Sequence, residues 1–341
     1  MHKIFTALLM IVFIVLAAFT GCSYDGHNGS PTAPDKTVAS ESSGTIADGA
    51  DEIDLKDLRY SGSELYIAIT SAGTVLALDD ALNRMEKQEE TGIKLEAAAW
   101  GNGRVVAAGG EGMIITSEDG VNWMQKETGT DADLYEVMWD GRQFIAVGRE
   151  TLLTSPDGDA WLCRKVPEIN PGNETSDRIS LFYGGIFWDG KQYFTGGSGN
   201  YILASEDLDK WTVVSGDSLG SGMYYGFAWN SNRYVAVGDH FEIITSEDGR
   251  NWTKEGLNIE YRDSIDDYYS LCINSVVWGQ EKFVAVGQRG LILVSDNGLD
   301  WSVIPPVTRS GLNRVIWDGR QYIAVGDNNT IVTSINGIDW E

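Results

Sequence analysis

The chain has 341 residues and a formal net charge of −25, from 50 Asp and Glu against 25 Lys and Arg. This acidic balance argues against nucleic acid or an anionic membrane surface as the main partner, because binding phosphate groups needs a basic surface. With 40 glycines and 43% hydrophobic residues, the composition is that of a folded, turn-rich chain and favours an all-β fold.

The N-terminal segment has the pattern of a secretory signal. After Lys3, an uninterrupted run of apolar or small residues extends from Ile4 to Thr20 and ends at Gly21 and Cys22. The alternative is an uncleaved transmembrane anchor, for which this run is short. The sequence Phe19-Thr20-Gly21-Cys22 resembles the bacterial lipoprotein cleavage box, in which the cysteine is acylated and becomes the mature N-terminus. The resemblance implies that residues 1–21 are a signal peptide and that a lipid on Cys22 anchors an exported protein to the cell membrane.

Residues 22–51 are rich in Ser, Gly, Thr, Asp and Pro and contain almost no large apolar side chains. This composition predicts a flexible tether between the anchor and the folded domain.

The rest of the chain is built from repeats. All 12 tryptophans fall into two series, and each member of the first series is followed nine residues later by a glycine. Each member of the second series is preceded six residues earlier by a serine. The first series is Trp100, Trp139, Trp188, Trp229, Trp278 and Trp317, and the second is Trp123, Trp161, Trp211, Trp252, Trp301 and Trp340. A seventh copy without tryptophan lies upstream, where Tyr66-Ile67-Ala68-Ile69 matches Tyr322-Ile323-Ala324-Val325.

One repeat predicts four short antiparallel strands. Asp140-Gly141 lies between two apolar alternating runs, which is a strong signal for a two-residue hairpin turn. Four-stranded units of about 40 residues are typical of β-propeller blades. Residues 52–341 have room for seven such units. We therefore predict an all-β domain over residues 52–341, a seven-bladed β-propeller of four-stranded antiparallel blades.

The turn between the third and fourth strands carries the pattern Ser-x-Asp-Gly-x-x-Trp, for example at Ser155, Asp157, Gly158 and Trp161. Leu208 replaces the glycine in one copy, and Asn297 and Asn336 replace the aspartate in two others. The pattern resembles the Asp box, or bacterial neuraminidase (BNR) repeat, of sialidases, sortilin-type receptors, some glucanases and the photosystem II assembly factor. We expect these Ser and Asp side chains to hydrogen-bond backbone groups within the turn, which is a structural role. The resemblance implies that any functional site lies on the opposite face.

Two connections on that opposite face are long, since 27 and 26 residues separate Trp161 from Trp188 and Trp252 from Trp278, against 16 to 18 elsewhere. Aromatic residues stand where the first strands of successive blades begin, and acidic residues are frequent in the long connections. They predict an aromatic, acid-rimmed concavity at the channel mouth. The alternative is that the rings cap the blade cores and that the acids are solvated. The candidate ligand-binding residues are Tyr135, Phe182, Tyr183, Tyr224, Tyr225, Tyr268, Tyr269, Asp177 and Asp266.

These features favour binding of a protein or glycan of the cell envelope or exterior by a monomer, with neither nucleic acid nor a cofactor. The alternative is a glycoside hydrolase, sialidase-like or other, acting on the same face, but the spacing of Arg59, Arg178 and Arg314 indicates no arginine triad. No catalytic residue is predicted. We expect no metal site, because the run containing Asp263, Asp266 and Asp267 lacks the spacing of a calcium loop.

Two further expectations concern the way the ring is held together. Cys163 and Cys272 fall in different blades, so we predict two free, buried thiols. The last repeat stops at Trp340-Glu341, before a complete outer strand. With Ser61 aligned to the first-series tryptophan, residues 43–48 fall in the register of that strand, so we expect them to pair with the last blade. The alternative is a tether that is disordered throughout.

Overall fold

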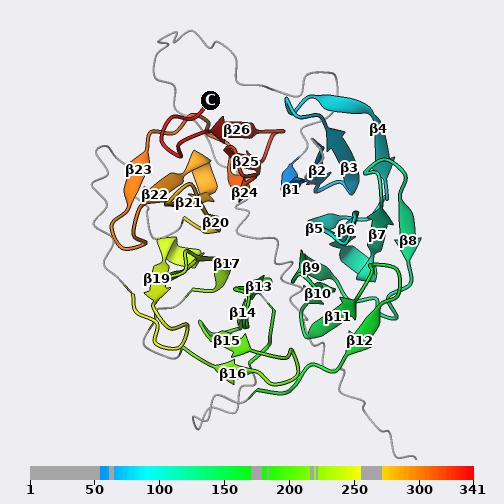
Figure 1. Cartoon of the computed structure of the whole chain (residues 1–341), viewed down its shortest axis with the longest axis horizontal. Coiled ribbons are helices and arrows are strands. Elements are labelled where there is room, and N and C mark those ends of the chain that lie inside the picture. Colours follow the sequence, from blue (N-terminus) through cyan, green and yellow to red (C-terminus); the bar gives the residue numbers. More distant parts are fainter. Residues whose placement is uncertain are drawn as a thin grey trace, which may run out of the picture. The chain divides into compact units, whose positions relative to one another are not determined.

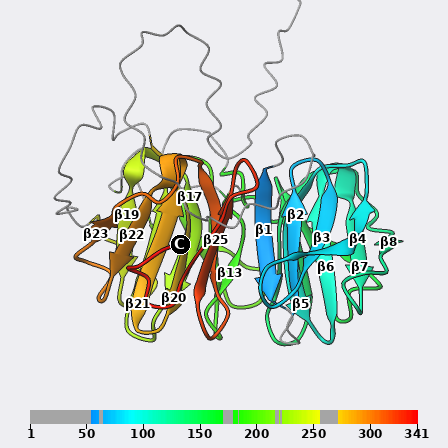
Figure 2. The same cartoon turned by 90° about the horizontal axis from the view of Figure 1, so that it is seen from above.

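Each predicted repeat forms an antiparallel sheet in the computed structural model, which describes residues 54–60, 65–169, 179–182, 184–215, 219, 222–254 and 271–341. The seven sheets are arranged around a central axis as the blades of a propeller (Figures 1 and 2). The predicted all-β, seven-bladed fold is therefore confirmed. The predicted signal peptide, the tether with Cys22, and the pairing of residues 43–48 all lie outside the described residues.

In every blade the strands follow one another from the axis to the rim. Blade 1 contains β1 (Leu55–Tyr60), β2 (Tyr66–Thr70), β3 (Thr74–Leu78) and β4 (Arg84–Glu90). Blade 2 contains β5 (Leu95–Gly101), β6 (Arg104–Gly109), β7 (Ile114–Ser117) and β8 (Met124–Lys126). Blade 3 contains β9 (Leu134–Trp139), β10 (Phe144–Gly148), β11 (Thr151–Ser155) and β12 (Leu162–Arg164). Blade 4 contains β13 (Phe187–Trp188), β14 (Tyr193–Gly196), β15 (Ile202–Ser205) and β16 (Thr212–Val213).

Blades 5 and 7 have three strands each among the described residues. Blade 5 contains β17 (Tyr224–Trp229), β18 (Tyr234–Gly238) and β19 (Ile243–Ser246). Blade 6 contains β20 (Ile273–Gly279), β21 (Lys282–Gly287), β22 (Ile292–Ser295) and β23 (Ser302–Ile304). Blade 7 contains β24 (Leu312–Trp317), β25 (Tyr322–Gly326) and β26 (Ile331–Ser334). Short 3₁₀ turns η1 (Gly110–Gly112), η2 (Asp239–Phe241) and η4 (Gln288–Gly290) join the second and third strands of blades 2, 5 and 6.

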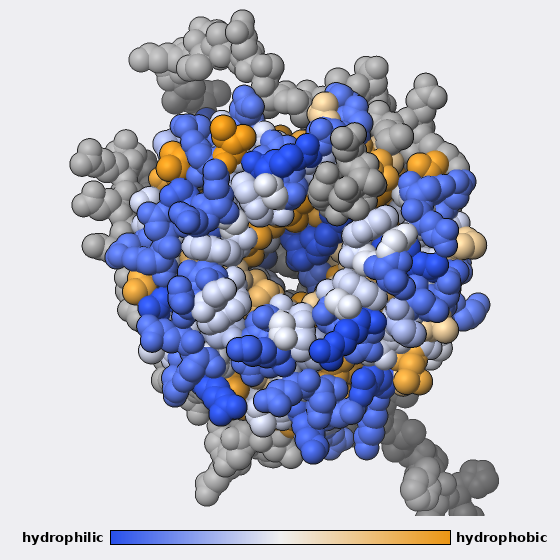
Figure 3. Space-filling model, in the orientation of Figure 1, coloured by the Kyte–Doolittle hydropathy of each residue, from blue (hydrophilic) through white to orange (hydrophobic). Residues whose placement is uncertain are grey.

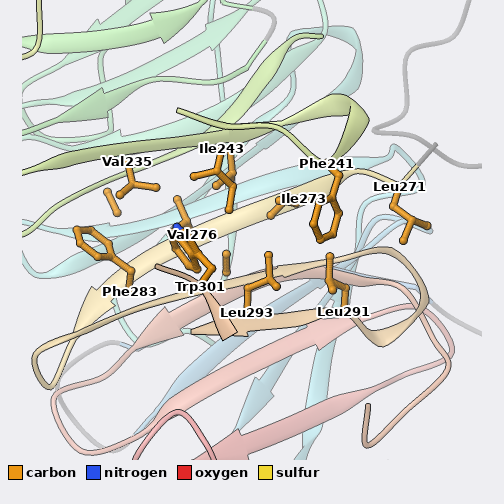
Figure 4. Close-up of a cluster of buried hydrophobic side chains, with 13 residues drawn as sticks. Val235, Phe241, Ile243, Leu271, Ile273, Val276, Phe283, Leu291, Leu293 and Trp301 are labelled. Carbon is orange, nitrogen blue, oxygen red and sulfur yellow. The ribbon is translucent and has the colours of Figure 1, made fainter. Parts of the chain in front are cut away.

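The second strands are buried on both faces because each blade packs between two neighbours. In β10, Ile145 and Val147 pack in a cluster shared with blade 4, whereas Phe144 and Ala146 pack in a cluster shared with blade 2. Figure 4 shows the equivalent cluster between blades 5 and 6. Burial of each large apolar side chain contributes about 1.5–3 kcal/mol, so these interfaces hold the ring together.

The turn between the third and fourth strands is held by its own side chains, as expected. In blade 3, the backbone N–H of Gly158 donates to Ser155 Oγ over 2.8 Å, and that of Asp159 donates to Asp157 Oδ1 over 2.9 Å. The Trp161 indole donates to the Gly158 carbonyl over 3.0 Å. In blade 6, Asn297 Oδ1 accepts the equivalent backbone bonds.

Tyrosines join adjacent blades. The hydroxyl groups of Tyr193 and Tyr234 each donate, over 2.5 Å, to the aspartate in the first turn of the preceding blade, Asp140 and Asp189 respectively. The same contact closes the ring, because Tyr66 of blade 1 donates to Asp318 of blade 7.

The turns of the blades are divided between two faces of the ring. The second-to-third-strand turns and the connections between blades share one face, which we call the connection face. Hydrogen bonds join the two kinds of segment: Gly110 of a turn donates its N–H to the carbonyl of Lys94 in a connection, and Thr91 of the same connection donates its N–H to the carbonyl of Gly73 in another turn. The first-to-second and third-to-fourth turns lie on the other face, the hairpin face. This arrangement was expected from the strand order.

The expectation of two free, buried thiols is wrong. Cys163 is free but exposed, because it lies on the outermost strand of blade 3, which has no neighbour on its outer side. Cys272 is buried but is disulfide-bonded.

Candidate site in the central channel

Charged side chains from blades 1, 3 and 7 meet in the central channel. Three of these side chains occupy equivalent positions in their blades. Each stands three residues before the residue that pairs with the first residue of the second strand: Asp57 before Tyr60, Glu136 before Trp139 and Arg314 before Trp317. The innermost strands therefore bring one register position of three blades to the same part of the axis.

Asp57 is the buried centre of this cluster, with a side-chain exposure of 1%. One carboxylate oxygen, Oδ1, accepts from Arg59 Nη1 over 2.8 Å and lies 3.4 Å from Arg314 Nε. The other, Oδ2, accepts from the backbone N–H of Ala98 in blade 2 over 2.9 Å. A buried carboxylate needs such partners, because an unpaired one would carry a large desolvation penalty.

Arg59 reaches from blade 1 across blade 2 toward blade 3. Its Nε donates to the Ala98 carbonyl over 2.7 Å, and its Nη2 donates to Glu136 Oε1 over 3.3 Å. Burial lowers the pKa of Arg59, and the opposing charge of Asp57 only partly offsets this effect.

Arg314 binds Glu136 through two parallel hydrogen bonds, from Nη1 to Oε2 over 2.8 Å and from Nη2 to Oε1 over 3.2 Å. Burial alone would lower the pKa of Arg314, but the charges of Glu136 and Asp57 outweigh it and raise the pKa. The forked geometry keeps the guanidinium in one orientation. We call Asp57, Arg59, Glu136 and Arg314 the channel network; its two acids and two arginines balance in charge.

A cavity of about 410 Å³ lies beside the network. Arg59, Glu136 and Arg314 form its charged wall. Its other walls come mainly from inner strands of blades 4 to 7 and are apolar: Ile186, Phe187, Phe227, Val276, Val277, Val315, Ile316 and Trp317. The small residues Gly184, Gly226 and Ser275 also line the cavity, and Tyr225 and Asp318 complete the lining. Figure 3 shows the surface hollowed at the centre of the ring.

Of the predicted binding residues, Tyr225 lines the cavity. Its hydroxyl donates to Asp239 Oδ1 over 2.8 Å, and burial together with this charge raises its pKa. Tyr135 lies in β9, half-buried and outside the lining.

Phe182 and Tyr224 are fully buried and belong to the core, as expected from the alternative interpretation that the rings cap the blade cores. Phe182 packs edge-on against Trp211 at 5.4 Å between ring centroids. Tyr224 donates its hydroxyl to the Leu219 carbonyl and to Glu242. Successive strand residues point to opposite sides, so Tyr224 faces the core while its neighbour Tyr225 reaches the cavity. The other predicted residues, Tyr183, Tyr268, Tyr269, Asp177 and Asp266, lie outside the described residues.

Sequence reasoning missed Asp57 and Glu136 and did not connect them with Arg59 and Arg314. A usable signal was present, because the residue three positions before the tryptophan position is charged in blades 1, 3 and 7 and uncharged in the other four blades. Within the described ranges, no group of three or more His, Cys, Asp and Glu residues is arranged to hold a metal ion, and no helix is long and apolar enough to span a membrane.

Comparisons with known proteins agree with the fold. No family model and no curated protein matches the chain. Among solved structures, the β-propeller domain of Myceliophteria thermophila Cps50 (Swd1) has a TM-score of 0.63 at 13% identity, covering 85% of this chain and 98% of that one. YCF48 from Cyanidioschyzon merolae has a TM-score of 0.62 at 13% identity, covering 86% and 98%. A structure of YCF48 bound to D1 peptide has a TM-score of 0.61 at 11% identity, covering 86% and 93%. At these identities the likeness establishes the class of fold, a seven-bladed β-propeller.

Proposed function

We propose that the protein is an exported lipoprotein, with Asp-box blades, whose propeller binds a segment of another envelope or extracellular protein in the central channel. The observation that carries the proposal is the axial cavity, which combines apolar walls with a charged wall. Binding pockets typically have such mostly apolar linings with a few placed polar groups.

The chemistry of the lining favours a protein segment over a glycan. A glycan needs many free hydrogen-bonding groups, whereas most charged groups here already satisfy one another. Protein segments supply apolar side chains that the walls from blades 4 to 7 could cover. The YCF48 structure with D1 peptide supports the proposal, since it records a peptide bound to a propeller of this fold.

The test uses the mature chain with Cys22→Ser and a random peptide library displayed on phage. Peptides enriched on this protein should bind at least tenfold more weakly to the double variant Glu136→Gln and Arg314→Gln, which removes one charge of each sign and so keeps the network neutral. Binding to Lys191→Ala, a change in an exposed residue of the hairpin face, should be unchanged. Near-ultraviolet circular dichroism checks that each variant is folded.

Three results would overturn the binding proposal: no enriched peptide, equal binding to the double variant, or loss of binding in Lys191→Ala. Chromogenic glycosides test the hydrolase alternative in parallel. Turnover that the double variant loses would support that alternative instead.

The lipid anchor has a test of its own. The protein should incorporate labelled palmitate during export, and Cys22→Ser should abolish the incorporation. Incorporation that persists in Cys22→Ser, or no incorporation in the wild type, would overturn the anchor.

A further inference from the structure

The cavity has two chemically different sides. Phe187, Val277 and Ile316 each stand immediately before a first-series tryptophan, are half-buried, and line the cavity. Phe187 also stacks on Phe227, with 6.4 Å between centroids and 18° between planes. These side chains, contributed by blades 4 to 7, give one side of the cavity its apolar character. We call Phe187, Phe227, Val277 and Ile316 the apolar wall.

Small residues stand on the apolar side at the register position of the charged ones. Blades 5 and 6 carry Gly226 and Ser275 where blades 3 and 7 carry Glu136 and Arg314. A Cβ atom on Gly226 would come within 3.1 Å of the Val276 nitrogen and 3.2 Å of Ser275 Cα, so β17 and β20 are closely packed there. Neither Gly226 nor Ser275 brings a charged side chain into the channel.

On the charged side, Arg314 retains hydrogen-bonding capacity. Its guanidinium has five N–H groups. Glu136 accepts one from each terminal nitrogen, and Nε lies 3.4 Å from Asp57. Two N–H groups therefore have no acceptor among the described residues. The side chain is 28% exposed, the most accessible member of the channel network.

Charge balance decides which acceptor suits these N–H groups. Asp57 and Glu136 already neutralise Arg59 and Arg314, and the other carboxylate of the lining, Asp318, is paired with Arg320. A carboxylate brought into this confined space would add an uncompensated negative charge and lose its hydration. A backbone carbonyl oxygen accepts the same bonds without either cost.

Resting on the proposed function, we propose that the cavity recognises an internal, uncharged stretch of an extended segment: one bulky apolar side chain packs on the apolar wall while a neighbouring backbone carbonyl accepts from Arg314. Neither a chain terminus nor an acidic side chain is the recognised feature.

The test takes the peptides enriched in the library selection and prepares each with a free or amidated C-terminus. Affinities should agree within about threefold, because the terminal carboxylate makes no contact. Replacing the central Leu, Ile or Phe of a peptide by Ala should weaken binding at least tenfold, which corresponds to about 1.4 kcal/mol. Replacing that residue by Asp should weaken it further.

Variants of the protein locate the contacts. Val277→Phe should narrow the cavity at the apolar wall and weaken binding at least tenfold while keeping that wall apolar, and Val277→Asp should abolish binding. Arg314→Lys keeps the charge but loses the forked geometry of the guanidinium, so it should lower the affinity for the unaltered peptide severalfold. Lys191→Ala is the control.

Two results would overturn this inference while leaving the proposed peptide binding intact. One is that the enriched peptides need a free C-terminal carboxylate, and the other is that they bind Val277→Phe as tightly as the wild type. Failure to enrich any peptide would overturn the proposed function, so the two failures are distinct. If Val277→Asp does not fold, Val277→Phe and the amidated peptides still test the inference.

Discussion

At the residue scale, the polar groups that matter most serve two contacts at once. Asp140 Oδ1 accepts the backbone N–H groups of Arg142 and Gln143 and so holds its own turn, while Oδ2 accepts from Tyr193 of the next blade. A single carboxylate therefore links the local turn to the packing of two blades.

These tyrosines predict how stability depends on alkaline pH. Burial, in most cases with a neighbouring carboxylate, raises the pKa of Tyr66 to about 12 and raises those of Tyr193, Tyr224, Tyr225, Tyr234 and Tyr322 as well. An unfolded tyrosine ionises near pH 10, so above that pH the unfolded chain binds fewer protons than the folded one. This stability is fully present below about pH 10 and is lost as pH rises toward the folded pKa values.

The measurement is the urea midpoint between pH 8 and pH 12. We expect it to fall steeply above pH 10, and the double variant Tyr193→Phe and Tyr234→Phe should show a shallower fall. A midpoint that stays level to pH 12 would contradict the assignment of these hydroxyl contacts.

At the scale of the element, the third-to-fourth turn repeats one solution with small variations. Gly158 has a φ of 78°, which a residue with a side chain rarely adopts, and in blade 4 Leu208 takes a φ of 68° at the equivalent position. Leu208 is buried against Trp211, so apolar packing offsets its backbone strain.

Asp157 offers a sharp test of this turn. Asn297 and Asn336 accept the same bonds elsewhere, so Asp157→Asn should change the free energy of unfolding little, whereas Asp157→Ala should reduce it by about 1 kcal/mol. Chemical denaturation followed by tryptophan fluorescence measures both. Equal losses in the two variants would mean that charge, rather than hydrogen bonding, is what the turn needs.

The elements also show why the fold was easier to predict from the sequence than the site. Trp139 and Asp140-Gly141 are local features, and their spacing repeats, so strands and turns could be placed. The contact of Arg59 with Glu136 joins residues 77 positions apart and arises only when the ring forms. Adjacent aromatic residues did not reveal the site either, because the alternation of side chains along a strand places Tyr224 in the core between blades and Tyr225 in the cavity.

At the scale of the whole molecule, the ring closes between blades 7 and 1 without a covalent connection through the described residues. Leu55, Leu58 and Tyr66 pack with Ile323 and Val325 there. Asn313 Nδ2 also donates to the Leu55 carbonyl over 2.9 Å.

The closing interface should open before the others. Tyr66→Phe removes the hydroxyl that donates to Asp318 and accepts from Arg320 at the closure, and Tyr193→Phe removes the one that donates to Asp140 between covalently consecutive blades. We expect Tyr66→Phe to increase hydrogen exchange about tenfold in blades 1 and 7, beyond its effect on global unfolding. Tyr193→Phe should produce no such local increase, and identical exchange patterns would contradict a weaker closure.

Pairing of residues 43–48 with blade 7 stays a prediction, with one refinement. Tyr60, rather than Ser61, pairs at the tryptophan position of blade 1. In blade 7, Glu341 exchanges two hydrogen bonds with Thr333, and β26 has no further outer partner among the described residues. Removing residues 22–51 should speed exchange of the Ile331 amide on the order of a hundredfold if the segment pairs there, with the Thr333 amide as the control. Equal rates would show that it does not.

The position of Asp54 and Leu55 also determines where a mechanical load would enter the described part of the chain. If the proposed lipid anchors the protein, a pull on the N-terminal segment reaches Asp54 and Leu55, which are held by blade 7 through Asn328 on Asp54 and Asn313 on Leu55. That tension would be shared by the first and last blades from the outset. A pull would have to shear β1 from its neighbours on both sides, instead of peeling away one rim strand at a time.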